Sequence, residues 1–185
     1  MPLDFQAAIT AHQEAVAGVS KLEPAIHQAV ERLQQTFAVG NRVYVCGNGG
    51  SASDAQHFAA ELTGRYDQDR PGYPAIALTT DTSALTSIGN DYGFDALFSR
   101  QLESLACKGD LLVAISTSGN SANVVKAAEY AHANGIYVIG LLGRDGGKLA
   151  KLVDLPLTIN SQKTGRIQEA HILILHLLCE AFEPA

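Results

Sequence analysis

The sequence predicts an α/β fold in which a five-stranded parallel sheet is covered by helices on both faces. Two observations carry this prediction. After Gly40, short runs rich in β-branched and aliphatic residues alternate with segments of helical pattern, and this alternation is typical of parallel sheets with right-handed crossovers. The chain also has 185 residues, of which 46% are hydrophobic, enough to bury a core without disulfides or a structural metal. We therefore expect a single domain over residues 1–185.

The segment before the first strand, residues 1–37, is expected to form a helical arm. Residues 20–23 have the form of a capping box and Pro24 fits a first helical turn, so we expect two helices with a break near residues 18–20. The arm could bury its apolar face against another subunit or against its own domain. Apolar residues recur in it every three or four positions, at Val16, Val19, Leu22, Ile26, Val30, Leu33 and Phe37.

The remaining elements follow in order. The predicted strands are residues 42–46, 75–79, 111–116, 137–142 and 153–159. The predicted helices are residues 53–65, 83–88, 94–105, 122–134 and 166–182, with a short helical turn near 147–150. In a sheet of this kind ligands bind beyond the carboxyl ends of the strands, so the loops at those ends are the first place to look for a site.

Composition argues against several classes of partner. The 19 acidic and 13 basic residues give a formal charge of −6, and the basic residues are scattered, so we expect neither nucleic acid nor an anionic membrane as a partner. Cys46, Cys107 and Cys179 are widely spaced, which is typical of reduced thiols in a cytosolic protein. Residues 1–4 show no signal-peptide pattern, and no apolar run reaches about 18 residues. We expect a cytoplasmic protein.

A glycine-rich loop, residues 47–51, follows the first predicted strand. Its glycines let backbone amides approach an anion, and Ser51 or Ser53 is placed to cap the next helix. The loop also matches a loose dinucleotide fingerprint. That fingerprint needs an acidic residue about 20 positions further on, whereas Asp81 lies about 30 positions on. A dehydrogenase is therefore disfavoured.

A hydroxyl-rich loop after the third predicted strand is the stronger signal for an anion site. Ser116, Thr117, Ser118 and Ser121 precede a helix whose free N–H groups could hold a phosphate together with the hydroxyls. The alternative is a polar loop with a serine cap. Because both loops follow strands of one parallel sheet, we expect them at the same edge, as a phosphate or sugar site.

Two further helices carry side chains suited to acid–base or metal chemistry. His57 and Glu61 are four residues apart among apolar neighbours, so they share one helix face. They are either a surface pair or a carboxylate and imidazole with a chemical task, and both are common zinc ligands. In the last helix His176 lies about 80° around the axis from Gln168. His176 is either a core residue or Gln168's partner in a site, and His171 is a supporting or interface group.

Six blocks of sequence resemble the sugar isomerase (SIS) domain family and, within it, the bacterial phosphoheptose isomerases. The resemblance spans nearly the whole chain. It implies a flavodoxin-like three-layer fold, a homotetramer with active sites between subunits, and conversion of sedoheptulose 7-phosphate to D-glycero-D-manno-heptose 7-phosphate for ADP-heptose and lipopolysaccharide core synthesis. The blocks are residues 47–51, 54–66, 70–76, 89–94, 116–121 and 166–169.

The resemblance also implies roles for individual residues. Glu61 and His176 would be the acid and the base of an enediol mechanism, in either order. Zinc, one ion per subunit, would be held by His57, Glu61, Gln168 and His176. The sugar phosphate would contact Asn48, Gly49, Gly50, Ser51, Glu61, Asn90, Asp91, Ser116, Thr117, Ser118, Ser121 and Gln168.

Two alternatives share the same fold: an adaptor that binds a replication initiator, and a sensor that binds a sugar phosphate without turnover. In the adaptor branch the positions of Glu61 and His176 are not an acid and a base. Here they are, so the adaptor interpretation leaves a carboxylate and an imidazole in apolar surroundings without a task. The enzyme is the favoured hypothesis.

Overall fold

The computed structural model describes residues 3–184, so residues 1, 2 and 185 of the predicted domain lie outside the described part. Five strands form one parallel sheet in the order β2-β1-β3-β4-β5. This confirms the predicted five-stranded parallel sheet, and the order is that of a flavodoxin-like fold with its switch point between β1 and β3. The strands are β1 (Val43–Cys46), β2 (Ala75–Ala77), β3 (Leu111–Ser116), β4 (Tyr137–Gly143) and β5 (Leu155–Ile159).

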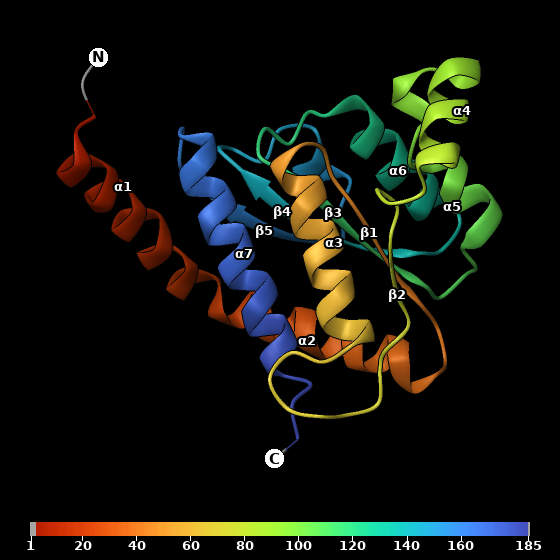
Figure 1. Cartoon of the computed structure of the whole chain (residues 1–185), viewed down its shortest axis with the longest axis horizontal. Coiled ribbons are helices and arrows are strands. Elements are labelled where there is room, and N and C mark those ends of the chain that lie inside the picture. Colours follow the sequence, from red (N-terminus) through yellow and green to blue (C-terminus); the bar gives the residue numbers. More distant parts are fainter. Residues whose placement is uncertain (1–2, 185) are drawn as a thin grey trace.

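Helices cover both faces of the sheet (Figure 1). Val43 and Val45 face one layer, formed by α2, α3 and α7, while Tyr44 and Cys46 face the other, formed by α5 and α6. The helices are α1 (Phe5–Ala17), α2 (Glu23–Ala38), α3 (Gly50–Thr63), α4 (Thr82–Tyr92), α5 (Ser99–Leu105), α6 (Ala122–Ala133) and α7 (Thr164–Glu180), with the 3-10 helices η1 (Val19–Leu22), η2 (Phe94–Ala96) and η3 (Leu149–Lys151). Among the described helices, none is long and apolar enough to cross a membrane.

The predicted helical arm and its break are confirmed, but the predicted capping box is wrong. The break is the 3-10 helix η1, in which Lys21 N donates to Gly18 O at 3.2 Å. Ser20 is therefore inside a helical turn and cannot take the extended backbone conformation of an N-cap. Helix α2 begins at Glu23 after Leu22, with Pro24 in its first turn as predicted.

Three other helices differ from prediction. Helix α4 ends at Tyr92, four residues beyond the end of the predicted helix over residues 83–88. Helix α3 begins at Gly50, three residues early, because Gly49 at φ +56° turns the chain into the helix and is itself the N-cap. Neither Ser51 nor Ser53 caps α3, as the sequence had suggested. The predicted helix over residues 94–105 is interrupted: Leu97 and Phe98 separate η2 from α5 and are both buried. These two side chains join the core beneath α6.

Helix α1 extends from the body of the molecule along α7 (Figure 1). Polar contacts join the two helices: Arg166 Nη1 donates to Ala8 O at 2.7 Å, and His12 Nδ1 lies 2.8 Å from Glu169 Oε2. Phe5 on α1 is 68% exposed. Helix α1 is thus held to the N-terminal part of α7, while Phe5 and Ile9, the latter 38% exposed, leave part of its apolar surface uncovered in the single chain.

His171 on α7 is fully buried against the C-terminal end of β4. Its Nε2–H donates to Leu142 O at 2.9 Å, and Nδ1 has no hydrogen-bond partner among the described residues. Burial is the main cause that lowers the pKa of His171 to about 4, and the bond to Leu142 O opposes it. The imidazole is therefore neutral at pH 7.

We expect His171 to make the protein less stable in mild acid. The unfolded chain takes up a proton at His171 near its ordinary pKa of about 6.5, whereas the folded chain does so only near pH 4, so the free energy of unfolding rises with pH between these values, by up to about 3 kcal/mol. Urea unfolding at pH 4.5, 5.5 and 7, at one protein concentration, measures the slope. His171→Gln keeps a donor for Leu142 O and should flatten this slope. An equal slope in both proteins would contradict the assignment.

Candidate active site

Two loops meet at the switch point of the sheet, where β1 and β3 lie side by side. Asn48, after β1, and Asn123, in the first turn of α6, exchange two side-chain hydrogen bonds of 2.8 Å each. Asn123 is 1% exposed. Asn123 was not among the predicted site residues, although an amide among the apolar residues that begin α6 was a usable signal. This pair fixes the glycine-rich loop against the hydroxyl-rich loop, which the sequence predicted to share one edge.

The hydroxyl-rich loop gathers three serines. Ser116 Oγ lies 3.0 Å from Ser121 Oγ and 3.5 Å from Ser118 Oγ. Ser121 is the N-cap residue of α6, but its hydroxyl contacts Ser116 instead of the helix N–H groups. The positive end of the α6 dipole therefore lies beside a cluster of hydroxyls. Such an arrangement can bind an anion without a cationic side chain, in a chain whose formal charge is −6.

Gly119 allows the loop after β4 to pack against the hydroxyl-rich loop. It has φ +65°, and a Cβ there would lie 1.9 Å from Gly146 O. Leu149 N donates to Gly119 O at 3.0 Å, and Lys148 N to Asn120 Oδ1 at 3.1 Å. The shape of the hydroxyl-rich loop thus depends on a glycine at this position.

Gln168 lies at the first turn of α3. A Cβ placed on Gly50 would be 2.3 Å from Gln168 Nε2, so a larger residue at position 50 would push this amide aside. Thus α7 contributes a polar group beside the glycine-rich loop. This contact brings Gln168 to the part of the predicted site that is formed by Gly49, Gly50 and Ser51.

A second group of side chains lies further along the same pair of helices. His57 Nε2 is 3.0 Å from Glu61 Oε1, and the His57 ring centroid is 5.1 Å from that of His176 on α7. Glu61 and His176 are therefore both neighbours of His57. The ring of Tyr66, which follows α3, is 5.6 Å from His176. Tyr66 was not assigned a role from sequence, because nothing in the local pattern tells where a residue after a helix will turn.

The predicted zinc ligands are only partly gathered. His57 is seven residues from Gly50, about 10 Å along α3 at 1.5 Å per residue, so Gln168 beside Gly50 stands apart from His57, Glu61 and His176. No three His, Cys, Asp or Glu side chains in residues 3–184 are grouped as a metal site. The donor types suit zinc, but His57 Nε2 is bonded to Glu61 and Gln168 points elsewhere. Side-chain rotation would be needed to complete the set.

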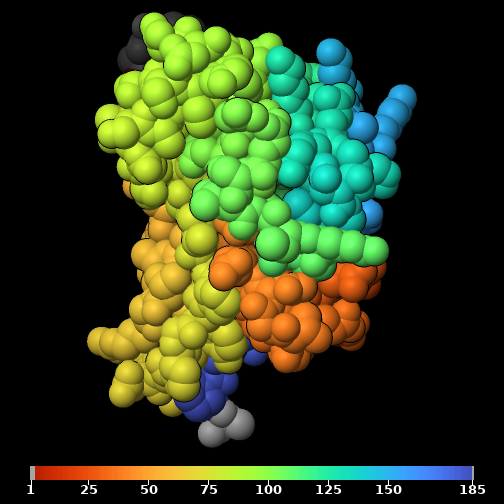
Figure 2. Space-filling model, turned by 90° about the vertical axis from the view of Figure 1, so that its right-hand side faces the viewer, coloured from red at the N-terminus to blue at the C-terminus, as the bar shows by residue number. Residues whose placement is uncertain are grey.

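Asn90 and Asp91 lie away from both groups, at the end of α4 on the periphery of the molecule (Figure 1). Every residue of α4 is at least partly exposed. Asn90 Nδ2 donates to Asp91 Oδ1 at 2.7 Å. In space filling, α4 forms the upper corner of the face shown in Figure 2. The single chain does not bring these two residues to Glu61 or Gln168.

Burial shifts the pKa of two groups near this site, Asp54 on α3 and Cys179 on α7, toward the neutral form. Burial raises the pKa of the Asp54 carboxyl to about 6, opposed by His57, and Asp54 Oδ2 has no hydrogen-bond partner within the described chain. Burial raises the pKa of the Cys179 thiol to about 12, and the Glu61 carboxylate adds to this. Both shifts arise because burial withdraws the charged form of the group from water.

A flavodoxin-like sheet with a hydroxyl-rich loop at its edge and a carboxylate and imidazoles beside it is typical of domains that bind sugar phosphates. The comparison with known proteins agrees with this class. Residues 4–143 match the model of the SIS domain. The chain belongs to the SIS domain family, and its relatives place it among the phosphoheptose isomerases of that family.

The similarity to individual relatives extends over almost the whole chain. It is 56% identical to the phosphoheptose isomerase of Helicobacter hepaticus over 97% of this chain and 91% of that protein. It is 56% identical to that of Aliarcobacter butzleri over 94% and 92%. The solved phosphoheptose isomerase of Neisseria gonorrhoeae superposes with a TM-score of 0.89 at 49% identity, covering 95% of this chain and 94% of that one.

Gly119→Ala should damage the hydroxyl-rich loop, because the backbone oxygen of Gly146 cannot move aside as a flexible side chain could. We expect a loss of about 2 kcal/mol or more in the free energy of unfolding, and weaker binding of inorganic phosphate by calorimetry. Gly165→Ala is the matched control, because a Cβ there meets open space. It should be neutral or slightly stabilising. Equal effects of the two changes would refute this account of the loop.

Proposed function

We propose that this protein is an aldose–ketose isomerase that converts sedoheptulose 7-phosphate to D-glycero-D-manno-heptose 7-phosphate. The observation that carries the proposal is the proximity of Glu61 and His176 to the same residue, His57, at the seam of α3 and α7. The names of relatives at 56% identity support the reaction. They favour an enzyme over an adaptor or a sensor.

The substrate phosphate would bind at the edge of the sheet. Ser116, Thr117, Ser118 and Ser121 would donate to it, with the α6 N-terminus supplying the favourable dipole. Asn48, Gly49, Gly50, Ser51 and Gln168 would bind hydroxyls of the sugar from the neighbouring loop. Asn90 and Asp91 are also proposed to contact substrate, and their distance from the other residues in one chain favours a site that is completed by a second subunit.

The reaction moves one proton between C1 and C2 and another between their oxygens. A carboxylate and an imidazole are sufficient for these transfers through a cis-enediol, and each typically contributes about 10² to 10⁴ in rate. We assign Glu61 to the carbon-bound proton and His176 to the oxygen-bound proton. His57 holds the Glu61 carboxylate at 3.0 Å, which orients it for transfer.

We propose zinc as a cofactor, one ion per subunit, held by His57, Glu61, Gln168 and His176. Two imidazoles and a carboxylate are typical zinc ligands, while the Gln168 amide is a weak one. When bound, zinc would supply Lewis acidity toward the substrate carbonyl. The other steps need only the residues of the chain.

The cellular setting is also part of the proposal. The chain would act in the cytoplasm, which agrees with its free cysteines Cys46, Cys107 and Cys179. It would form a homotetramer with active sites between subunits, which agrees with the exposed apolar residues of the arm, among them Phe5 at 68% exposure. Its product would serve ADP-heptose and lipopolysaccharide core synthesis.

The role of Glu61 is tested with the conservative change Glu61→Gln. We expect kcat for sedoheptulose 7-phosphate to fall by about 10² or more because the carbon-bound proton loses its acceptor, while phosphate affinity is retained. Glu23→Gln is the matched control, since Glu23 also faces a histidine four residues on, at 3.9 Å in an exposed pair. In deuterated water the wild-type aldose should carry label at C2. Full activity of Glu61→Gln would exclude the assigned role of Glu61, whereas unlabelled product would replace the exchanging enediol model by intramolecular transfer or a hydride shift.

The zinc proposal is tested by dialysis against a chelator. Elemental analysis of the untreated protein should give about one zinc per chain, chelation should abolish turnover, and added Zn²⁺ should restore it. His57→Gln should reduce the zinc content, because an imidazole binds zinc better than an amide does. Full turnover by metal-free protein would rule out a catalytic zinc.

A further inference from the structure

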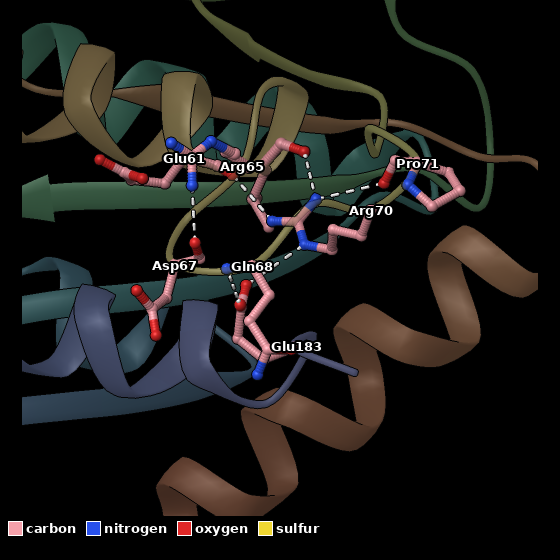
Figure 3. Close-up of polar contacts among 8 residues, drawn as sticks. Glu61, Arg65, Asp67, Gln68, Arg70, Pro71 and Glu183 are labelled. Atoms are coloured by element: carbon pink, nitrogen blue, oxygen red, sulfur yellow. Dashed lines mark hydrogen bonds and ion pairs between the residues drawn. The ribbon is translucent and has the colours of Figure 1, made fainter. Parts of the chain in front are cut away.

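A buried arginine caps the end of the helix that carries Glu61. Arg70 lies in the loop between α3 and β2, and its side chain is 3% exposed. Its Nη2 donates to Glu61 O at 2.8 Å, and Nη1 donates to Leu62 O at 3.1 Å and to Pro71 O at 3.2 Å (Figure 3). The last carbonyls of an α-helix have no partner inside the helix. Arg70 supplies a partner for the carbonyl of Glu61 and a second one for that of Leu62, which also accepts from Tyr73 N at 2.9 Å, and its positive charge suits a helix C-terminus.

The counter-ion of Arg70 comes from the C-terminal end of the chain. Glu183 Oε1 lies 3.5 Å from Arg70 Nε, and the Glu183 side chain is 12% exposed. Glu183 Oε2 accepts a hydrogen bond of 2.6 Å from Gln68 N, in the same loop as Arg70. Removing one partner of such a buried pair leaves an uncompensated charge. The docked C-terminal segment therefore supplies the charge that compensates the buried guanidinium, through an ion pair whose Nε and Oε1 atoms form no hydrogen bond within the described chain.

Aromatic contacts and close backbone packing also hold the loop between α3 and β2 against the C-terminal residues, α2 and the end of α3. The Arg70 guanidinium lies 5.0 Å from the centre of the Tyr73 ring, whose centroid is 4.8 Å from that of Phe37 on α2 and 4.9 Å from that of Phe182. A Cβ on Gly72 would lie 2.3 Å from Thr63 O, the last residue of α3. The loop is thus pressed against the helix end. In space filling, the loop and the C-terminal residues meet at the lower edge of the molecule (Figure 2).

We propose that Arg70 is a positioning residue for Glu61, and that Glu183 acts through Arg70. This inference rests on the proposed isomerase function, because it concerns the same carboxylate. Arg70 binds the main-chain carbonyl of Glu61 itself, so a shift of the guanidinium moves the residue that carries the carboxylate. A displacement of about 1 Å at a reacting group can cost of the order of 10² in rate. The C-terminal segment thereby sets the geometry of the acid–base pair.

The test compares Arg70→Met with a matched control, Arg32→Met. Arg32 also lies over a tyrosine ring, 4.1 Å from the centroid of Tyr137, but its Nη1 donates to the exposed Gln35 side chain instead of to a helix carbonyl. For Arg70→Met we expect kcat per folded molecule to fall about tenfold or more, with KM changed less than about twofold. Arg70→Lys should recover part of kcat, and Arg32→Met should match the wild type.

The variant Glu183→Gln and hydrogen exchange at the end of α3 test the same inference independently of Arg70→Met kinetics. Glu183→Gln is the milder change. It should lower kcat about threefold or more, again with KM changed less than about twofold. Hydrogen exchange of amides 61–64 should be at least about tenfold faster in Arg70→Met than in Arg32→Met. If Arg70 only stabilises the fold, the melting temperature falls while kcat per folded molecule stays constant, and that result would overturn the proposal.

The same experiment separates the two hypotheses. Faster exchange at residues 61–64 in a protein whose wild type shows no isomerase activity would refute the proposed function and leave the helix cap in place. Wild-type isomerase activity with unchanged kcat in both Arg70→Met and Glu183→Gln would refute the positioning role alone. Should Arg70→Met fail to fold, Glu183→Gln decides by the same two readouts.

Discussion

The packing of α3 against α7 is the contact on which the candidate site depends. Helix α3 carries Gly50, His57 and Glu61, and α7 carries Gln168 and His176. Both helices also bury apolar side chains in the same layer over the sheet, so their relative position is fixed by the core. The polar residues lie along the edge of a seam whose apolar part holds them in place. A change in that packing would move every member of the site at once.

The direction of α3 places its two ends at different parts of the candidate site. Its N-terminus begins at the carboxyl end of β1, beside the hydroxyl-rich loop, and its C-terminal turn carries Glu61. From Gly50 to His57 is about 10 Å along the axis. An extended seven-carbon chain, with bonds of about 1.5 Å, has a length of the same order. One helix can therefore span the proposed substrate from its phosphate end toward its carbonyl end.

Sequence patterns predicted the sheet and the loops at its edge because both are local consequences of composition. The alternation of strand and helix patterns predicted all five strands with boundaries within two residues, and the glycine and serine loops lie where strands end. The failures have a common cause. Ser20, Ser51 and Ser53 look like caps in sequence, but whether a serine caps depends on its backbone angles, which neighbouring turns decide. Asn123 and Tyr66 acquire neighbours only when distant segments meet.

The Arg70–Glu183 pair is the clearest case of what sequence alone could not predict. The two residues are 113 positions apart, and each looks like an ordinary charged residue in a polar stretch. Only the folded chain shows that both are nearly buried and that the guanidinium binds the carbonyl of Glu61. A buried charge pair adds little to stability compared with apolar residues of the same size. Its location at the end of α3 therefore suggests that its value lies in orientation: a guanidinium with several fixed donors defines the direction of a helix end more narrowly than apolar contacts can.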